Sequence, residues 1–407
     1  PRTQKKIITS ILQFRLIFGG TFLILSTLIS PYLNFIFFKG NLNYSFFLLA
    51  FSFGLLSQVL MQSIDLYRLI YKPWTYVIIN FIQSLLTFTF IFSFAYFLKL
   101  NIFGYILGSF LSTLTVSILS WWKLKSFLDI SKIHYEFWGK LIRFGAPLVP
   151  SSIAIYFMNS ADRWFILYFR SEDELGIYSI GLKFSMIIAL IINTFRQAFW
   201  PIALESMQED SGKNFFRQIS KVYFGFGCSL IILFTFFSRS MVEFLTPPEY
   251  HESWRIIGIL SWQFFFYGFF LISYAGIWKK EKTFLNIYLT SIATLFALIL
   301  NYILVPSFGI IGASLGTSIT YLIWVLISTF ISQKYWKINY PYRDLSLSFG
   351  ISLIICTLII TNQKEDFSLA LAFGTFASIL FCLINIKANL SPKLILDKLK
   401  SLKNENL

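Results

Sequence analysis

The chain has 407 residues, of which 56% are hydrophobic and 13% charged, with a mean hydropathy of +0.68 and a formal net charge of +15. Soluble domains carry about 25% charged residues, so this composition excludes a water-soluble globule. A transmembrane β-barrel is excluded as well, because its strands would be alternating segments of about 10 residues, whereas the apolar runs of this chain are about 20 residues long.

Twelve apolar segments that are long enough to cross a bilayer follow one another along the chain. Their expected bounds, in chain order, are 16–38, 44–64, 74–97, 104–122, 147–169, 177–199, 221–242, 256–277, 284–304, 310–332, 344–361 and 368–386. The sequence therefore predicts an all-α, polytopic membrane protein with about 12 transmembrane helices.

The lysine and arginine residues are distributed unequally between the two sides of these segments. Of the 34, 25 fall in the terminal segments and alternate loops of one side, and only 6 fall in the loops of the other side. Because cytoplasmic loops are enriched in Lys and Arg, both ends of this chain are predicted to be cytoplasmic. The positive charge is thus a topology signal that also favours contact with anionic lipids, and we expect no nucleic-acid partner.

An internal repeat connects the two halves of the chain. The segment from Phe103 to Leu119 aligns without a gap with the segment from Phe308 to Trp324, and a Phe, a Gly, two Ile, a Ser and a Thr coincide. Repeated halves are common in transporters. The four spans from 16–38 to 104–122 are thus expected to repeat as the four from 221–242 to 310–332. The second set of four is preceded by two further spans, 147–169 and 177–199, and the first set by none. We therefore expect the first helix pair of the first half to be missing from this chain.

The repeat also predicts the domain organisation. We expect an incomplete N-terminal bundle of four helices, a six-helix bundle preceded by a cytoplasmic linker, and an appended helix pair with a basic tail. Their expected bounds are 1–125, 126–343 and 344–407.

The residues that commonly bind metals or form disulfides give no site. Cys228, Cys356 and Cys382 all lie within apolar runs, so a disulfide framework is not expected. The two histidines, His134 and His251, lie in different loops, and no metal site or cofactor is predicted from them.

Four charged residues fall inside the predicted spans. Asp162 and Arg163 lie near the outer end of one span, Lys183 lies at a similar depth in the next, and Arg196 lies nearer the cytoplasm. A buried charge in a membrane usually has a partner. One hypothesis is therefore a structural ion pair between Asp162 and a neighbouring cation. The other is a water-filled cavity or an anionic ligand, because three cations face a single internal anion.

Further polar residues and two prolines accompany these charges. Asn159 lies on the same face of its predicted helix as Arg163. In the next span, Arg196 lies about 140° around the helix axis from Lys183. Gln197 lies closer to the face of Lys183. Pro147 and Pro150 precede or open the span of Asn159 and are candidates for a hinge.

The middle of the chain resembles the bacterial polysaccharide-biosynthesis flippases, which are the O-antigen and exopolysaccharide translocases of the multidrug/oligosaccharidyl-lipid/polysaccharide exporter superfamily. The residues that carry the resemblance are Phe144, Gly145, Pro147, Pro150, Ser151, Ser152, Asn159, Ser160, Asp162, Arg163, Glu174, Gly176, Ile177, Tyr178, Ser179 and Lys183. The resemblance implies a MATE-like fold of two six-helix bundles, with two further helices at the C-terminal end.

The resemblance also implies a substrate and a location. An undecaprenyl-pyrophosphate-linked oligosaccharide would be moved by alternating access from the cytoplasmic to the periplasmic leaflet of the bacterial inner membrane. Proton coupling and sodium coupling both remain open. Membrane lipids and other membrane proteins of polysaccharide assembly are the further partners expected.

Pyrophosphate recognition by this kind of protein assigns roles to the intramembrane residues. Arg and Lys suit a pyrophosphate in a cavity of low dielectric. The residues expected to contact the head group are Arg163, Lys183, Asp162, Asn159, Arg196 and Gln197.

Three alternatives remain. A lipid II-type flippase and a multidrug or cation antiporter belong to the same superfamily, although an antiporter for cations favours acidic residues in its cavity. An integral-membrane polysaccharide polymerase or glycosyltransferase is of a different class. It would need catalytic carboxylates or a large extramembrane region, and the longest loop here is about 20 residues. A transporter rather than an enzyme is therefore expected.

Overall fold

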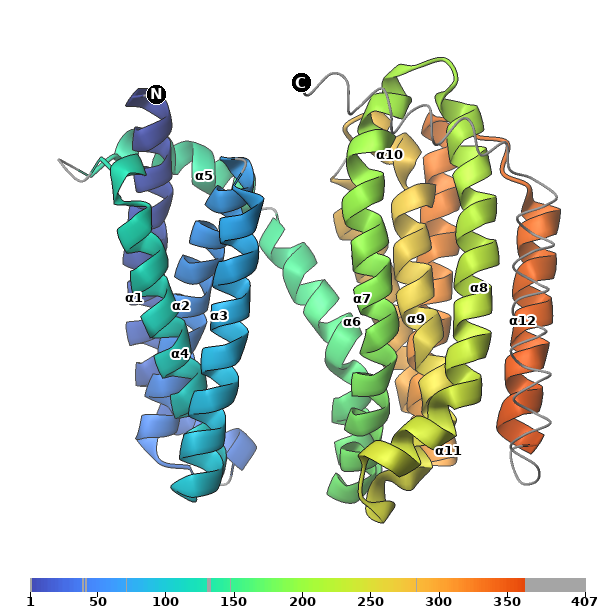
Figure 1. The fold of residues 1–407 in the computed structure, drawn as a ribbon, viewed down its shortest axis with the longest axis horizontal. Helices are drawn as coiled ribbons and strands as arrows, with labels where there is room; N and C mark the ends of the chain where they lie inside the picture. The colour runs from blue at the N-terminus through green and yellow to red at the C-terminus, as the bar shows by residue number, and fades with distance from the viewer. Residues whose placement is uncertain are drawn as a thin grey trace. The chain divides into compact units, whose positions relative to one another are not determined.

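The computed structural model describes residues 2–38, 40, 42–70, 72–129, 133–146, 148–282 and 284–362, and this part of the chain consists of helices joined by short turns and connections (Figure 1). In chain order the elements are α1 (Arg2–Phe38), α2 (Tyr44–Leu69), α3 (Pro73–Ile91), the π-helical η1 (Phe92–Phe97), α4 (Asn101–Lys123), η2 (Lys125–Phe127), η3 (Tyr135–Phe137), α5 (Trp138–Gly145), α6 (Leu148–Phe169), α7 (Glu172–Gln208), α8 (Gly212–Leu245), η4 (Pro248–Ser253), α9 (Trp254–Ser273), α10 (Ala275–Lys279), α11 (Leu285–Tyr335) and α12 (Tyr342–Asn362).

The predicted spans coincide with these helices. Within the described residues, nine helices are long and apolar enough to cross a membrane. α6 also coincides with a predicted span, although its polar Asn159, Asp162 and Arg163 make it less apolar. α11 contains two predicted spans, and the last one, 368–386, lies outside the described residues. The all-α membrane fold is confirmed.

The chain forms two compact units, residues 1–147 and 148–407. In the first unit, α4 packs against the hairpin partner α3–η1 through small residues. A Cβ on Gly104 would lie 2.6 Å from the carbonyl carbon of Phe94, and a Cβ on Gly108 would lie 2.7 Å from the amide nitrogen of Ile91. Two glycines one turn apart therefore allow the two backbones to touch, as small residues often do between membrane helices.

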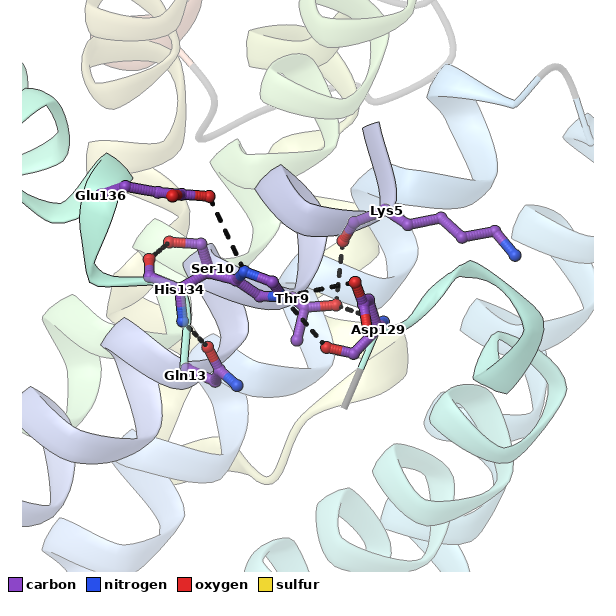
Figure 2. A network of polar contacts seen from close by, with 7 residues as sticks. All are labelled: Lys5, Thr9, Ser10, Gln13, Asp129, His134 and Glu136. Carbon is purple, nitrogen blue, oxygen red and sulfur yellow. Dashed lines mark hydrogen bonds and ion pairs between the residues drawn. The ribbon is translucent and has the colours of Figure 1, made fainter. Parts of the chain in front are cut away.

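The segment between α4 and α6 packs on α1 in the first unit (Figure 2). His134 is buried there, and its backbone amide donates a hydrogen bond to Oε1 of Gln13 at 3.0 Å. The Ser10 hydroxyl donates to the His134 carbonyl at 2.8 Å, and the backbone amide of Asp129 donates to the Thr9 hydroxyl at 2.8 Å. The first compact unit ends at residue 147 and includes this linker, which the repeat assigned to the second bundle. The predicted division into 1–125, 126–343 and 344–407 stays a prediction.

The second unit begins with a helical hairpin, α6–α7, whose turn is specified by the sequence. Ser171 is the N-cap of α7, and its hydroxyl accepts a hydrogen bond from the amide of Glu174 at 3.1 Å. Acidic residues fill the first turn of α7, where they complement the helix dipole. The guanidinium of Arg170, at the end of α6, pairs with Glu174 at 3.0 Å.

α11 is two helical arms rather than one rod. Gly309 has a φ of +55° and lies between them. In a straight helix Leu304 and Gly312 would be about 12 Å apart, yet a Cβ on Gly312 would touch the Leu304 carbonyl oxygen, and Gly316 lies beside Asn301. The chain therefore reverses at Gly309. The repeated segments 103–119 and 308–324 thus each lie in the second arm of a hairpin tightened by glycines.

The core of the second unit is rich in aromatic side chains. Phe265 is fully buried and makes edge contacts with Phe224 and Trp262 at ring-centroid distances of 5.0 and 5.4 Å. α12 packs along α8, and the Lys221 ammonium lies 3.0 Å from the Asp344 carboxylate at the start of α12. This packed core holds α6, α7, α9 and α11 in fixed positions around the charged residues.

Of the two predicted hinge prolines, Pro150 is the third residue of α6. Proline is tolerated in the first turn of a helix because the amide there has no helical acceptor. Pro147 lies outside the described residues. The role of these prolines as a hinge stays a prediction.

Candidate functional site

Asp162 is the most buried of the charged residues predicted within the spans. It is 2% exposed, and it lies where α6, α7 and α11 meet. The Tyr178 hydroxyl donates a hydrogen bond to Oδ2, the Thr317 hydroxyl approaches the same oxygen at 3.4 Å, and the Arg163 backbone amide donates to Oδ1 at 2.8 Å. A buried carboxylate is tolerated only with such partners, so this carboxylate fixes the junction of three helices.

The charged groups of the nearby cations form no hydrogen bond with Asp162 in the described part of the chain. Among the described residues, the Asp162 carboxylate forms no ion pair with Arg163 or Lys183. The Arg163 guanidinium interacts with it only by charge, and its buried Nε has no hydrogen-bond partner in the described part of the chain. Asp162 and Arg163 therefore interact by charge within α6, and no ion pair joins Asp162 to Lys183 among the described residues.

The remaining predicted residues divide into two groups. Lys183 and Gln197 are exposed on the surface of α7, and neither forms a hydrogen bond or ion pair with a described residue. Arg196 is half-buried, and its Nη1 donates to the Tyr267 hydroxyl on α9 at 3.2 Å. Asn159 is exposed, and its Oδ1 accepts a hydrogen bond from the Tyr321 hydroxyl on α11.

A cavity of about 250 Å³ lies among α6, α7, α9 and α11. Its lining residues are Ile155, Met158, Asn159, Ala189, Ile192, Asn193, Phe264, Tyr267, Tyr321 and Trp324. The sequence alone indicated Asn159 but not Asn193, Tyr267, Tyr321 or Trp324. The one signal that could have indicated this wall is Asn193, an amide at the end of an apolar run in α7.

The first unit has a more polar cavity of about 420 Å³, lined by side chains of α2, α3 and α4. Asp65, Asn80 and Gln83 contribute to its wall. The Gln83 Nε2 donates to the hydroxyls of Thr87 and Thr113 at 3.2 and 3.1 Å, and its buried Oε1 has no partner among the described residues. The polar side chains of these helices therefore face a common space.

Comparison with solved structures identifies the class of this fold. The chain is similar to the lipid II flippase MurJ in its inward-closed conformation, with a TM-score of 0.72 and 14% identity over 95% of this chain and 85% of that one. It is also similar to a MATE protein in its straight conformation, with a TM-score of 0.56 and 15% identity over 86% and 81% of the two chains. The protein is a multi-pass membrane protein with the MATE-like transporter fold.

The chain belongs to the polysaccharide biosynthesis protein family, whose model matches residues 2–253. It is 27% identical over 270 residues to the capsular polysaccharide biosynthesis protein CapF of Staphylococcus aureus, a match covering 62% of this chain and 64% of that protein. It is 23% identical over 273 residues to the probable low-salt glycan biosynthesis flippase Agl15 of Haloferax volcanii, covering 64% and 57%. The chain thus matches about three fifths of the length of these two relatives.

A third relative is the putative O-antigen transporter of Shigella flexneri, which is 23% identical over 219 residues and is matched over 52% of each chain. The names of these relatives confirm the family resemblance that the motifs of α6 and α7 indicated.

Proposed function

We propose that this protein is a flippase that moves an undecaprenyl-pyrophosphate-linked oligosaccharide, an O-antigen or exopolysaccharide repeat unit, from the cytoplasmic to the periplasmic leaflet of the inner membrane by alternating access. Relatives named as a glycan flippase and as an O-antigen transporter support this class of substrate. In this proposal the described N-terminal helix begins on the cytoplasmic side, as the distribution of Lys and Arg favours.

One observation carries the proposal. Asp162, the internal anion, accepts its hydrogen bonds from neutral donors, so no side-chain hydrogen bond or ion pair joins Arg163, Lys183 or Arg196 to a carboxylate among the described residues, although Asp162 acts on Arg163 by charge. Cations within a membrane-spanning region need an anion or water. A pyrophosphate supplies both negative charge and several acceptor oxygens. Arg163, whose Nε is buried and has no partner in the described part of the chain, is the first candidate to contact it.

The proposed roles of the other residues follow from their positions. Lys183 and Gln197, both exposed on α7, would meet the head group at its edge, and Arg196 and Asn159 would contact it beside the cavity. Asp162 would position Arg163 and couple α6, α7 and α11 to the charge of a proton or sodium ion. The Lys- and Arg-rich side would contact anionic lipids.

Complementation tests the proposal. The full-length gene is expressed in a strain that lacks its own O-antigen flippase, and surface glycan and membrane abundance are both measured. Arg163→Ala and Lys183→Ala should each reduce export at normal abundance. Arg239→Ala is the matched control, because Arg239 lies at the end of α8 in an exposed pair with Glu243. Export that survives both test substitutions would overturn the proposed site.

A further inference from the structure

The cavity of the second unit is lined by uncharged side chains. Its polar groups are the amides of Asn159 and Asn193 and the phenols of Tyr267 and Tyr321, and the rest of its wall is apolar or aromatic. Such a wall does not suit a pyrophosphate, which needs cations. It suits a neutral ligand that has both apolar faces and hydroxyl or amide groups.

Several of these polar groups have hydrogen-bonding capacity that the described residues do not use. The Asn193 side chain forms no hydrogen bond with them, and Asn159 uses only its Oδ1. The Trp324 Nε1 is buried and has no partner there. The Tyr267 oxygen accepts from Arg196, so its own proton remains to be donated. An unpaired buried group such as the Trp324 Nε1 is destabilising, and a ligand that pairs with it would remove this penalty.

The size of the cavity limits what it can hold. At about 250 Å³ it lies just below the range of about 300–1,000 Å³ that is usual for drug-sized ligands. A single sugar ring fits this volume better than an oligosaccharide does.

The position of the cavity relates it to the proposed pyrophosphate site. Asn159 precedes Arg163 by one turn of α6, a rise of about 6 Å. A ring held at Asn159 would therefore bring a phosphate attached to that ring within reach of the Arg163 guanidinium.

We propose that this cavity binds one neutral sugar ring, namely the sugar that is bonded directly to the pyrophosphate of the lipid-linked substrate. This inference rests on the proposed flippase function. The amides of Asn159 and Asn193 and the Tyr267 hydroxyl pair with the sugar hydroxyls, and the aromatic wall covers an apolar face of the ring. The rest of the glycan and the lipid lie outside the cavity.

Direct binding tests the inference with two short-chain probes. One is geranyl pyrophosphate, and the other is the same compound with a glucose, galactose or N-acetylglucosamine on its terminal phosphate. Affinities are measured by calorimetry on the purified full-length protein in detergent. The wild-type protein should bind at least one sugar-bearing probe at least tenfold more tightly than the sugar-free probe.

Matched variants assign that difference to the cavity. Asn193→Leu and Trp324→Phe should each weaken the sugar-bearing probe about tenfold and leave the sugar-free probe unchanged. Lys183→Met should weaken both probes equally. Thermal unfolding verifies that each variant is folded. If either Asn193→Leu or Trp324→Phe does not fold, the other still tests the cavity.

The possible outcomes distinguish a failure of the proposed sugar site from a failure of the proposed flippase function. If the wild-type protein binds all the probes equally well, or if Asn193→Leu and Trp324→Phe weaken them all equally, the sugar site is wrong and the flippase proposal stands. If the wild-type protein binds none of the probes, both proposals fail.

Discussion

The hydroxyl group of Tyr178 on α7 donates a hydrogen bond to the carboxylate of Asp162 on α6, and both side chains are buried. The two residues are only 16 positions apart, on the two arms of one hairpin. The partner of the Asp162 carboxylate on α7 is therefore a phenol, whereas one hypothesis from the sequence was a cation. This exchange leaves Arg163 available to an external anion, and it makes Tyr178 a residue on which the geometry of the site depends.

Tyr178→Phe should lower the stability of the second unit. The substitution removes one of the three donors to a buried carboxylate, and hydrogen bonds to charged groups contribute about 1.5–3 kcal/mol. The midpoint of thermal unfolding in detergent is the measurement. Tyr168→Phe is the control, because Tyr168 is 80% exposed and its loss of a hydroxyl should change little. Equal midpoints for the wild type and Tyr178→Phe would show that the hydrogen bond is not needed for stability.

Asp162→Asn should separate the charge of this side chain from its packing. An asparagine has nearly the same shape, and its single side-chain oxygen can still accept hydrogen bonds from Tyr178 and Thr317, with loss of the one from the Arg163 amide. The protein should therefore still reach the membrane. Glycan export should nevertheless fall at least tenfold, because the substitution removes the charge that we propose for coupling. Asp162→Leu, which leaves both hydroxyls without an acceptor, should reduce abundance as well. Unchanged export in Asp162→Asn would argue against any role for the charge.

Gly309→Ala should destabilise the second unit by about 1–3 kcal/mol, the cost of a residue in a sparsely populated backbone region. The φ of +55° is unfavourable for alanine, and the new Cβ would lie 2.8 Å from Oε2 of Glu174. Gly54→Ala in α2 is a matched control, because a Cβ at residue 54 would meet nothing within 4 Å and alanine is the better helix former. The expected order of unfolding midpoints is thus Gly54→Ala at or above the wild type, and Gly309→Ala below it.

Gly104→Ala should loosen the first unit, because its Cβ would press on the backbone of Phe94 and overpacking costs about 1–3 kcal/mol. Gly20→Ala on α1 has open space at the corresponding position and should be neutral. Thermal unfolding of both variants gives the comparison. A neutral Gly104→Ala would mean that α3–η1 and α4 can move apart without cost.

The helices could be predicted from the sequence because apolar runs of membrane length leave few alternatives. A reversal between residues 304 and 310 was also expected, because the sequence predicts two spans, 284–304 and 310–332, where α11 has its two arms. The packing of the linker on α1 was not predictable, because it depends on hydrogen bonds that join His134 to Ser10 and Gln13, residues more than 100 positions away in the chain.

The sequence predicted which charged residues belong to the site, but not which residues they contact. Charges stand out in an apolar run, so Asp162, Arg163, Lys183 and Arg196 were evident from the sequence. Tyr178 and Thr317 were not assigned to Asp162, because a tyrosine or threonine in a membrane helix has many uses and Thr317 is 155 residues away. Asn193 was overlooked because a single amide gives no pattern.

The tight reversal of α11 has a consequence for mapping this protein in a membrane. The turn consists of little more than Gly309, and the Arg170 guanidinium and the Glu174 carboxylate lie against it. Proteases and inserted epitopes need several residues of accessible chain, so this turn will escape them whichever side it faces. The segment η4 between α8 and α9, predicted on the same side, offers a six-residue stretch outside the long helices and is the better place to read the orientation of the second unit.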